Sequence, residues 1–431
     1  MKQEVFDPLV TYRLQLHKGF GFQEVKKIIP YLSGLGIKTI YASPIFSASP
    51  GSEHGYDGID PLSINPEIGS MEELYELSAM LKKNGMGWIQ DFVPNHMAFH
   101  TDNKWLMDVL EKGLHSTYAS FFDIQWNNPE TNGKIMVPFL GDPLEKILDK
   151  GELQIKLAEN KLWVDYFGSS WPLTLSSYAM VLSETNSQSI SDWLHSLNEM
   201  EKLPFSNEQY EAKLLAFKDL LQDDAVEKEI ITAIEKVNTD KNKIQLIIDQ
   251  QHYLPCYWKL TDTKISYRRF FTVNSLICMN MQEENVFTAY HTLLKKLCDE
   301  DVIDGVRVDH VDGLYDPGAY LDKLADHIGR HKYLVVEKIL EEEEALVKWP
   351  VAGTTGYDFL ARVNNVFTNN SKEKEFNIFY ESFTGLSSIV GNQVYEKKTL
   401  ILEKHMQGEL KNLVRLFFEL KLTGKKYRET S

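Results

Sequence analysis

The sequence predicts an α/β fold built on a parallel β-sheet. Three observations favour this class. Strand-like and helix-like segments alternate over residues 1–97, the alternation resumes near residue 301, and two of the later strand-like runs end in an acidic residue. Such alternation is typical of β-α-β units, whose strands lie parallel in one sheet. The pattern leaves open whether this sheet is open or closed into a barrel.

Five elements are expected in the first 97 residues: a strand at 9–14, a helix at 22–35, a strand at 37–41, a helix after residue 70 and a strand at 87–93. Apolar residues recur at helical spacing in the first helix, although Pro30 predicts a kink or an early break there. Ser70 and Glu73 form a capping box that begins the second helix, and Gly85 closes it.

The alternation is interrupted between residues 98 and 300, a stretch that is aromatic-rich at first and then helical. Loops after strands are where α/β enzymes vary most. We therefore predict a large, mostly helical insertion at 98–300 after the third strand. The sheet is expected to continue over 301–365, and a helical tail to follow at 366–431.

Two acids mark the strand-like runs after the insertion. Asp309 ends the run that begins at Gly305, and Glu337 ends the run that begins at Tyr333, 28 positions later (337 − 309). One β-α-β repeat takes about 30 residues, and neighbouring strands lie ~4.8 Å apart. Retaining glycosidases hold two carboxyl groups ~5–5.5 Å apart. The spacing therefore predicts a carboxyl pair for glycosyl chemistry, although a structural Arg-Asp pair and a surface Glu remain alternatives.

Composition narrows the class of partner. The 431 residues carry a formal net charge of −16, which disfavours nucleic acid and anionic membranes and suits a neutral substrate. The three cysteines form no CxxC pair, so no zinc or redox motif is expected. No apolar run approaches the ~20 residues of a membrane span, and the first eight residues lack the apolar stretch of a secretory signal. We expect a cytoplasmic protein with no metal and no cofactor.

Four short motifs resemble signatures of the α-amylase superfamily, glycoside hydrolase family 13: His54–Asp57, Asp91–His96, Gly305–Asp309 and Val336–Glu337. Five longer segments resemble the maltooligosyl trehalose synthases within it: Thr11–Leu16, Pro50–Asp57, Tyr267–Phe271, Asp309–Leu314 and Val351–Phe359. Asp312 and Gly313 stand where a simple α-amylase usually carries Lys-His, which disfavours that enzyme.

The resemblance implies part of a (β/α)8 TIM barrel and a maltooligosaccharide substrate. It implies an intramolecular transglucosylation that turns the reducing-end α-1,4 linkage into an α,α-1,1 linkage, the reaction of a glucan glucosylmutase in trehalose biosynthesis. Asp309 would be the nucleophile and Glu337 the acid/base.

The resemblance also implies substrate contacts, each with a structural alternative. His96 would donate to a sugar hydroxyl, or be a satisfied core histidine. Tyr56 would stack under a sugar ring, or pack in the core. Asp91 and Asn95 are divided evenly between substrate contacts and partners of Arg307. Asp57 is divided evenly between a substrate contact and a structural residue. Weaker candidates, for which interdomain salt bridging or packing is the alternative, are Arg268, Arg269, His310, Asp312 and Tyr357.

The sequence departs from the family in two places. No Asp follows Asp358, although the superfamily carries a third essential Asp after an Asn-His pair on a later strand. Thr272 stands where the family usually has Asp. Since family members are also longer, we expect the later barrel strands and a C-terminal sheet domain to be missing. The chain would be a truncated product, a fragment, or half of an enzyme with a complementary C-terminal chain. The alternatives are an inactive maltodextrin-binding product and an α-glucan hydrolase.

Overall fold

A parallel sheet of six strands forms the core of the part of the chain that holds both acids. The computed structural model describes residues 6–202, 206–341 and 343–421. Its contacts divide the chain into a first unit, made of the residues up to Met97 and Met279–Leu410, and a second unit, made of Ala98–Cys278 and the residues from Lys411 onward.

The strands of the first unit lie side by side in chain order, and every neighbouring pair is parallel. They are β1 (Thr11–Leu14), β2 (Thr39–Ala42), β5 (Gly87–Phe92), β14 (Gly305–Val308), β15 (Tyr333–Val336) and β16 (Gly353–Thr354). A doubly wound sheet reverses its order at a switch point, whereas a sheet that grows at one edge is typical of a barrel. The predicted α/β class and parallel sheet are confirmed.

Helices and a hairpin complete the first unit. The hairpin is β3 (Phe46–Ala48) with β4 (Gly58–Ile64), and β6 (His96–Ala98) crosses into the second unit. The helices are α1 (Phe22–Gly34), α2 (Met71–Lys83), α10 (Glu284–Tyr290), α11 (Thr292–Asp299), α12 (Pro317–Ile328), α13 (Tyr357–Asn365), α14 (Glu373–Thr384), α15 (Val390–Lys404) and α16 (Gln407–Glu419), which crosses into the second unit, with 3-10 turns at Val311–Gly313 and Asn370–Lys372.

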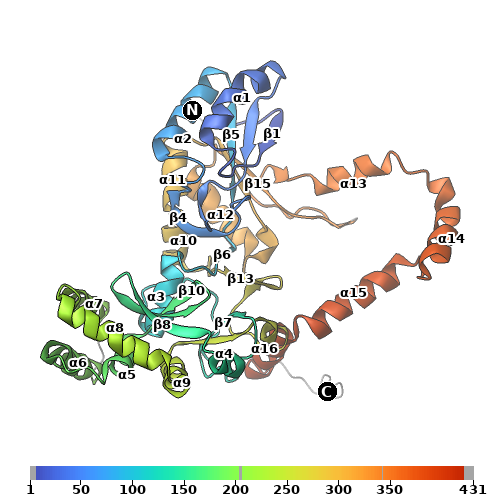
Figure 1. Ribbon diagram of the computed structural model, residues 1–431. Coiled ribbons are helices and arrows are strands. Elements are labelled where there is room, and N and C mark those ends of the chain that lie inside the picture. Colours follow the sequence, from blue (N-terminus) through green and yellow to red (C-terminus); the bar gives the residue numbers. More distant parts are fainter. Residues whose placement is uncertain (1–5, 203–205, 342, 422–431) are drawn as a thin grey trace. The chain divides into compact units, whose positions relative to one another are not determined.

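Helices α1 and α2 lie beside the first strands (Figure 1). Phe22 of α1 meets Trp88 of β5 edge to face, with ring centroids 6.3 Å apart. The capping box of Ser70 and Glu73 begins α2 as predicted. The early break predicted at Pro30 is wrong, since α1 runs on to Gly34. Ile29 and Leu32 are buried on either side of that proline, and this burial stabilises the helix against the lost backbone hydrogen bond.

The second unit contains strands that the sequence pattern did not predict. They are β7 (Ile135–Leu140), β8 (Leu153–Ala158), β9 (Lys161–Tyr166), β10 (Ser169–Pro172), β11 (Tyr253–Tyr257), β12 (Arg269–Phe270) and β13 (Val273–Cys278). The helices are α3 (Lys104–Lys112), α4 (Leu144–Asp149), α5 (Tyr178–Leu182), α6 (Gln188–Glu201), α7 (Asn207–Leu220), α8 (Asp224–Asn238) and α9 (Lys241–Gln250), with 3-10 turns at Gly113–His115, Leu175–Ser177 and Trp258–Asp262.

The predicted domain boundaries stay predictions. Residues 279–300, which were assigned to the insertion, make their contacts within the first unit as α10 and α11. The described part of the tail, residues 367–421, is mostly helical, and none of the described residues of α13, α14 and α15 is buried.

We predict that Gly305→Ala destabilises the pairing of β14 with β15. A Cβ at Gly305 would lie 2.7 Å from the carbonyl oxygen of Tyr333 and 2.8 Å from its Cβ, so one strand has to move. The free energy of unfolding in urea should fall by about 1–3 kcal/mol. The matched control is Gly391→Ala in α15, where a Cβ meets nothing within 4 Å. That change should be neutral or slightly stabilising. Equal effects of the two substitutions would contradict the steric account.

Candidate active site

Three neighbouring strands bring their polar residues to one face of the sheet. Asp91 of β5 lies opposite Arg307 of β14, and Val308 lies opposite Val336 of β15. Side chains alternate along a strand, so Asp309, two residues after Arg307, shares its face. Glu337 lies level with Asp309 one strand further on, because Val308 and Val336 precede them in register. The predicted placement of the two acids at the ends of adjacent parallel strands is confirmed.

A single guanidinium bridges these carboxylates. Nη1 of Arg307 donates to Oδ1 of Asp91 at 2.7 Å and to Oδ1 of Asp309 at 2.6 Å. Nη2 lies 3.0 Å from Oε1 of Glu337. The side chains of Arg307 and Asp91 are 7% and 0% exposed, and those of Asp309 and Glu337 are 10% and 21% exposed. The two strand-end acids are therefore the more accessible members of the cluster.

Two tyrosines anchor Asp91. The hydroxyls of Tyr56 and Tyr41 donate to Oδ2 of Asp91 at 2.5 Å and 2.7 Å. Arg13 donates to the Tyr56 hydroxyl at 3.2 Å, and its guanidinium lies over the Tyr41 ring, 5.5 Å from the centroid. Tyr41 and Arg13 were not predicted as site residues. Tyr41 and Arg13 lie opposite each other near the ends of β2 and β1, and their positions in these strands are the feature that could have indicated them.

His96 and Asn95 follow β5 and are both buried. The Asn95 amide lies 3.3 Å from Nδ1 of His96, and Nε2 of His96 lies 3.1 Å from the Tyr56 carbonyl oxygen. The carbonyl can only accept, which assigns the imidazole proton to Nε2. His96 therefore holds the loop that carries Tyr56. A sugar hydroxyl could accept the hydrogen bond from Nε2 only in place of the Tyr56 carbonyl oxygen.

Two further candidates contact Glu337. The backbone N–H of His310 donates to Oε2 of Glu337 at 2.9 Å. His310 adopts a left-handed conformation, with φ 45°, directly after the strand. The Tyr357 hydroxyl lies 3.4 Å from Oε1 of Glu337, and Tyr357 is 42% exposed. The His310 N–H and the Tyr357 hydroxyl thus contact different oxygens of the Glu337 carboxylate.

Asp57 and Arg268 each contact residues of their own unit. Asp57 accepts a hydrogen bond from the Ser52 hydroxyl and lies 3.7 Å from Nδ1 of His54, within its own loop. Arg268 belongs to the second unit, where its Nε donates to Oδ2 of Asp123 at 2.7 Å. Asp57 is thus held within its own loop, and Arg268 forms a salt bridge with Asp123.

Burial dominates the electrostatics of the cluster. It raises the pKa of Asp309 to about 7, with Arg307 opposing the rise and the charges of Asp91 and Glu337 adding to it. Burial also raises the pKa of Asp91, against the attraction of Arg307. Three carboxylates face one guanidinium, so the cluster is poised to hold a proton near neutral pH. Among the residues that the structure describes, no group of His, Cys, Asp and Glu side chains is arranged to hold a metal ion.

Comparisons with known proteins find similar sequences and a similar fold. The family model of the α-amylase catalytic domain matches residues 21–155. A putative maltooligosyl trehalose synthase of Mycobacterium tuberculosis is 31% identical over 385 residues, 88% of this chain and 41% of the relative. The solved DSM5389 glycosyltrehalose synthase is 34% identical with a TM-score of 0.76, covering 95% of this chain and 48% of that one. The solved maltooligosyltrehalose synthase of Arthrobacter ramosus is 29% identical with a TM-score of 0.74. That match covers 95% of this chain and 45% of the other.

Each of these three relatives is longer than this chain. The chain spans less than half the length of each. No helix among the described residues is long and apolar enough to cross a membrane.

We predict a pH-dependent stability from Asp309. Its folded-state pKa of about 7 lies above the ordinary value of about 3.9, so between these values the folded state retains a proton that the unfolded chain releases. The contribution of Asp309 to stability is complete below about pH 4 and is lost as the pH rises to about 7. Asp309→Asn cannot ionise. Its free energy of unfolding relative to the parent should therefore rise with pH over this range, by up to roughly 4 kcal/mol.

Urea unfolding at pH 4.5 and at pH 8 measures the effect. Asp219→Asn in α7, where the side chain is exposed, is the matched control and should keep a constant difference from the parent. A constant or falling difference for Asp309→Asn would contradict the assigned direction.

Proposed function

Because the chain belongs to the maltooligosyl trehalose synthase family of the α-amylase superfamily, we propose that its carboxylate pair catalyses glycosyl transfer on maltooligosaccharides. The reaction is the conversion of the reducing-end α-1,4 linkage into an α,α-1,1 linkage. The observation that carries the proposal is the bridge from Arg307 to Asp309 and Glu337 at the ends of two adjacent parallel strands. A retaining double displacement requires two carboxyl groups ~5–5.5 Å apart, and one guanidinium contacts both of these.

In the first step Asp309 attacks C1 of the penultimate glucose. The bond between C1 and O4 of the terminal glucose breaks, and Glu337 gives its proton to the departing O4. Asp309 reacts as the carboxylate, the form that its ion pair with Arg307 stabilises against burial. A covalent glycosyl ester on Asp309 and a free glucose result.

In the second step the retained glucose turns within the site. Its anomeric O1 attacks C1 of the ester, the bond to Asp309 breaks, and Glu337 takes the proton from O1. Two displacements at C1 retain its configuration. Transfer in place of hydrolysis requires that water be kept from the ester while the glucose turns.

The surrounding residues are assigned supporting roles. Tyr56 forms the platform under the sugar ring, and Asp91 fixes its hydroxyl. His96 and Asn95 hold the loop beneath that platform. The peptide N–H of His310 and the Tyr357 hydroxyl orient Glu337 toward the glycosidic oxygen. Asp57 and Arg268 are proposed as substrate contacts of the assembled enzyme.

The proposal includes a barrel larger than the described sheet. The relatives are more than twice as long as the matched region, since it covers 41% to 48% of them. We infer that the third acid of the superfamily lies on a strand beyond those of this sheet, from the same chain or from a complementary one.

We predict that Glu337→Gln accumulates a covalent sugar ester on Asp309 when it is incubated with α-maltotriosyl fluoride. Fluoride departs without a proton from Glu337, so the ester still forms, whereas its breakdown lacks the general base. Mass spectrometry of proteolytic fragments should find the maltotriosyl group on the peptide that contains Asp309.

The control is the double variant Asp309→Asn with Glu337→Gln, which should remain unlabelled. An ester on another carboxylate would assign the nucleophile elsewhere. Equal labelling of the double variant would show that Asp309 takes no part in the covalent step.

A further inference from the structure

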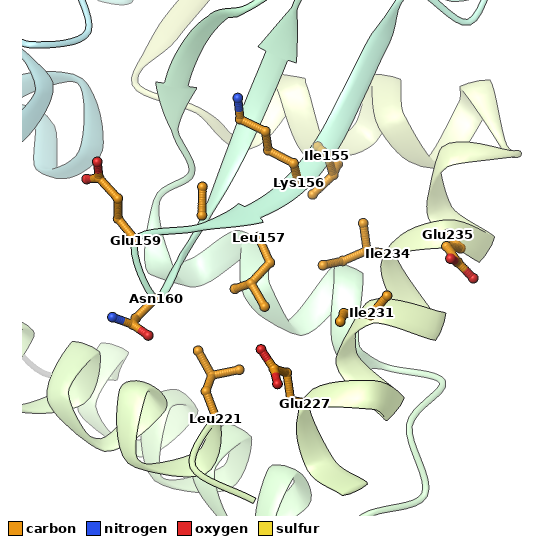
Figure 2. Close-up of a pocket in the computed structure, with 11 residues that line it drawn as sticks. Ile155, Lys156, Leu157, Glu159, Asn160, Leu221, Glu227, Ile231, Ile234 and Glu235 are labelled. Atoms are coloured by element: carbon orange, nitrogen blue, oxygen red, sulfur yellow. The ribbon is translucent and has the colours of Figure 1, made fainter. Parts of the chain in front are cut away.

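A groove of about 440 Å³ lies in the second unit, between strand β8 and helix α8. Its apolar lining includes Leu157 of β8, Leu221 before α8, and Ile231 and Ile234 of α8. Figure 2 shows these four side chains converging on the space between strand and helix. The volume is within the range of sites that hold a ligand or a short peptide.

One wall of the groove is the edge strand of a sheet. β8 is the outer strand of the sheet β10-β9-β8. At Ile155 the edge is occupied by a side chain, because Asn238 accepts from the Ile155 N–H at 2.7 Å and donates to its carbonyl oxygen at 2.8 Å. The Asn238 amide thus takes the place of one residue of a neighbouring strand.

The next outward position on this edge is Leu157. A two-residue turn at Glu159 and Asn160, with φ 50° and 59°, joins β8 to β9. In such a hairpin the flanking pair, here Ala158 and Lys161, exchanges hydrogen bonds, and the pattern alternates along the strands. The N–H and carbonyl of Leu157 therefore point away from β9, as those of Ile155 do, toward the groove.

The charge at the groove is negative. Glu227 lies four residues before Ile231 and is half-buried, and Figure 2 shows its carboxylate between Leu221 and Leu157. Glu235 and Glu159 lie at the rim, and none of the three carboxylates has an ion pair or side-chain hydrogen bond among the residues that the structure describes. Lys156, the one basic residue among the described residues of the lining, is paired with Asp165.

We propose that this groove binds an extended polypeptide segment of alternating apolar and basic residues. The segment adds a strand to β8, with its backbone hydrogen-bonded to Leu157 beyond the position of Asn238. An apolar side chain enters between Leu221 and Ile234, and a lysine or arginine next to it pairs with Glu227.

The composition of the groove favours this occupant over two others. Among the described residues, none that lines the groove is aromatic and could stack on a sugar ring. A second copy of this chain carries a net charge of −16, and like charge opposes self-association at an acidic surface.

The test uses the full chain and a fluorescent nine-residue peptide of alternating valine and lysine, with binding measured by fluorescence anisotropy. Glu227→Gln should weaken binding about five- to tenfold, the effect of removing one partly buried charge pair. Glu145→Gln in α4 removes the same charge from an exposed position of the second unit and should leave binding unchanged.

Two altered peptides separate the two parts of the proposal. N-methylation of alternate peptide bonds blocks strand pairing on one edge, so one of the two possible methylation registers should abolish binding while the other retains it. A peptide with glutamate in place of lysine should not bind. Equal binding of both methylated registers, equal binding of the acidic peptide, or an unchanged affinity in Glu227→Gln would overturn the proposal.

Discussion

The site depends on one buried cation. Transferring a guanidinium from water into a protein interior costs several kcal/mol unless paired groups offset it. Arg307 meets this cost with three carboxylates from three successive strands: Asp91, Asp309 and Glu337. The arrangement exists only in one register of β5, β14 and β15, because a shift of one residue would turn every side chain to the opposite face. The same ion pairs that stabilise Arg307 therefore hold the two strand-end acids side by side.

Much of this part of the molecule could be predicted because its signals are local. Each acid ends a short apolar run, and the 28 positions between them fit one strand-helix repeat. Other features depend on partners distant in the chain. Tyr41 contacts Asp91 across 50 positions, and β7 pairs with β11, which begins 118 positions after it (253 − 135). Short apolar runs of this kind do not distinguish a strand from a buried helix segment. At Pro30 the local sequence is misleading, because burial of Ile29 and Leu32 outweighs the tendency of proline to end a helix.

The two units use unpaired groups differently. In the first unit the charges are gathered around Arg307, and burial holds the pKa of Asp309 near 7, at the expense of stability. In the second unit the edge of β8 is only partly closed by Asn238, and the Glu227 carboxylate has no ion pair or side-chain hydrogen bond among the described residues. Natural proteins usually cover or charge such an edge. Here the acidic rim disfavours an acidic strand and favours a basic one at the peptide groups of Leu157.

The central claim is that Asp309 and Glu337 act as a nucleophile and an acid/base pair. The most direct measurement is the anomeric configuration of the sugar first released from α-maltosyl fluoride, followed by proton NMR before mutarotation. Double displacement predicts that the α-anomer appears first. Initial release of the β-anomer would mean a single displacement by water. The pair bridged by Arg307 would then not be a nucleophile and an acid/base.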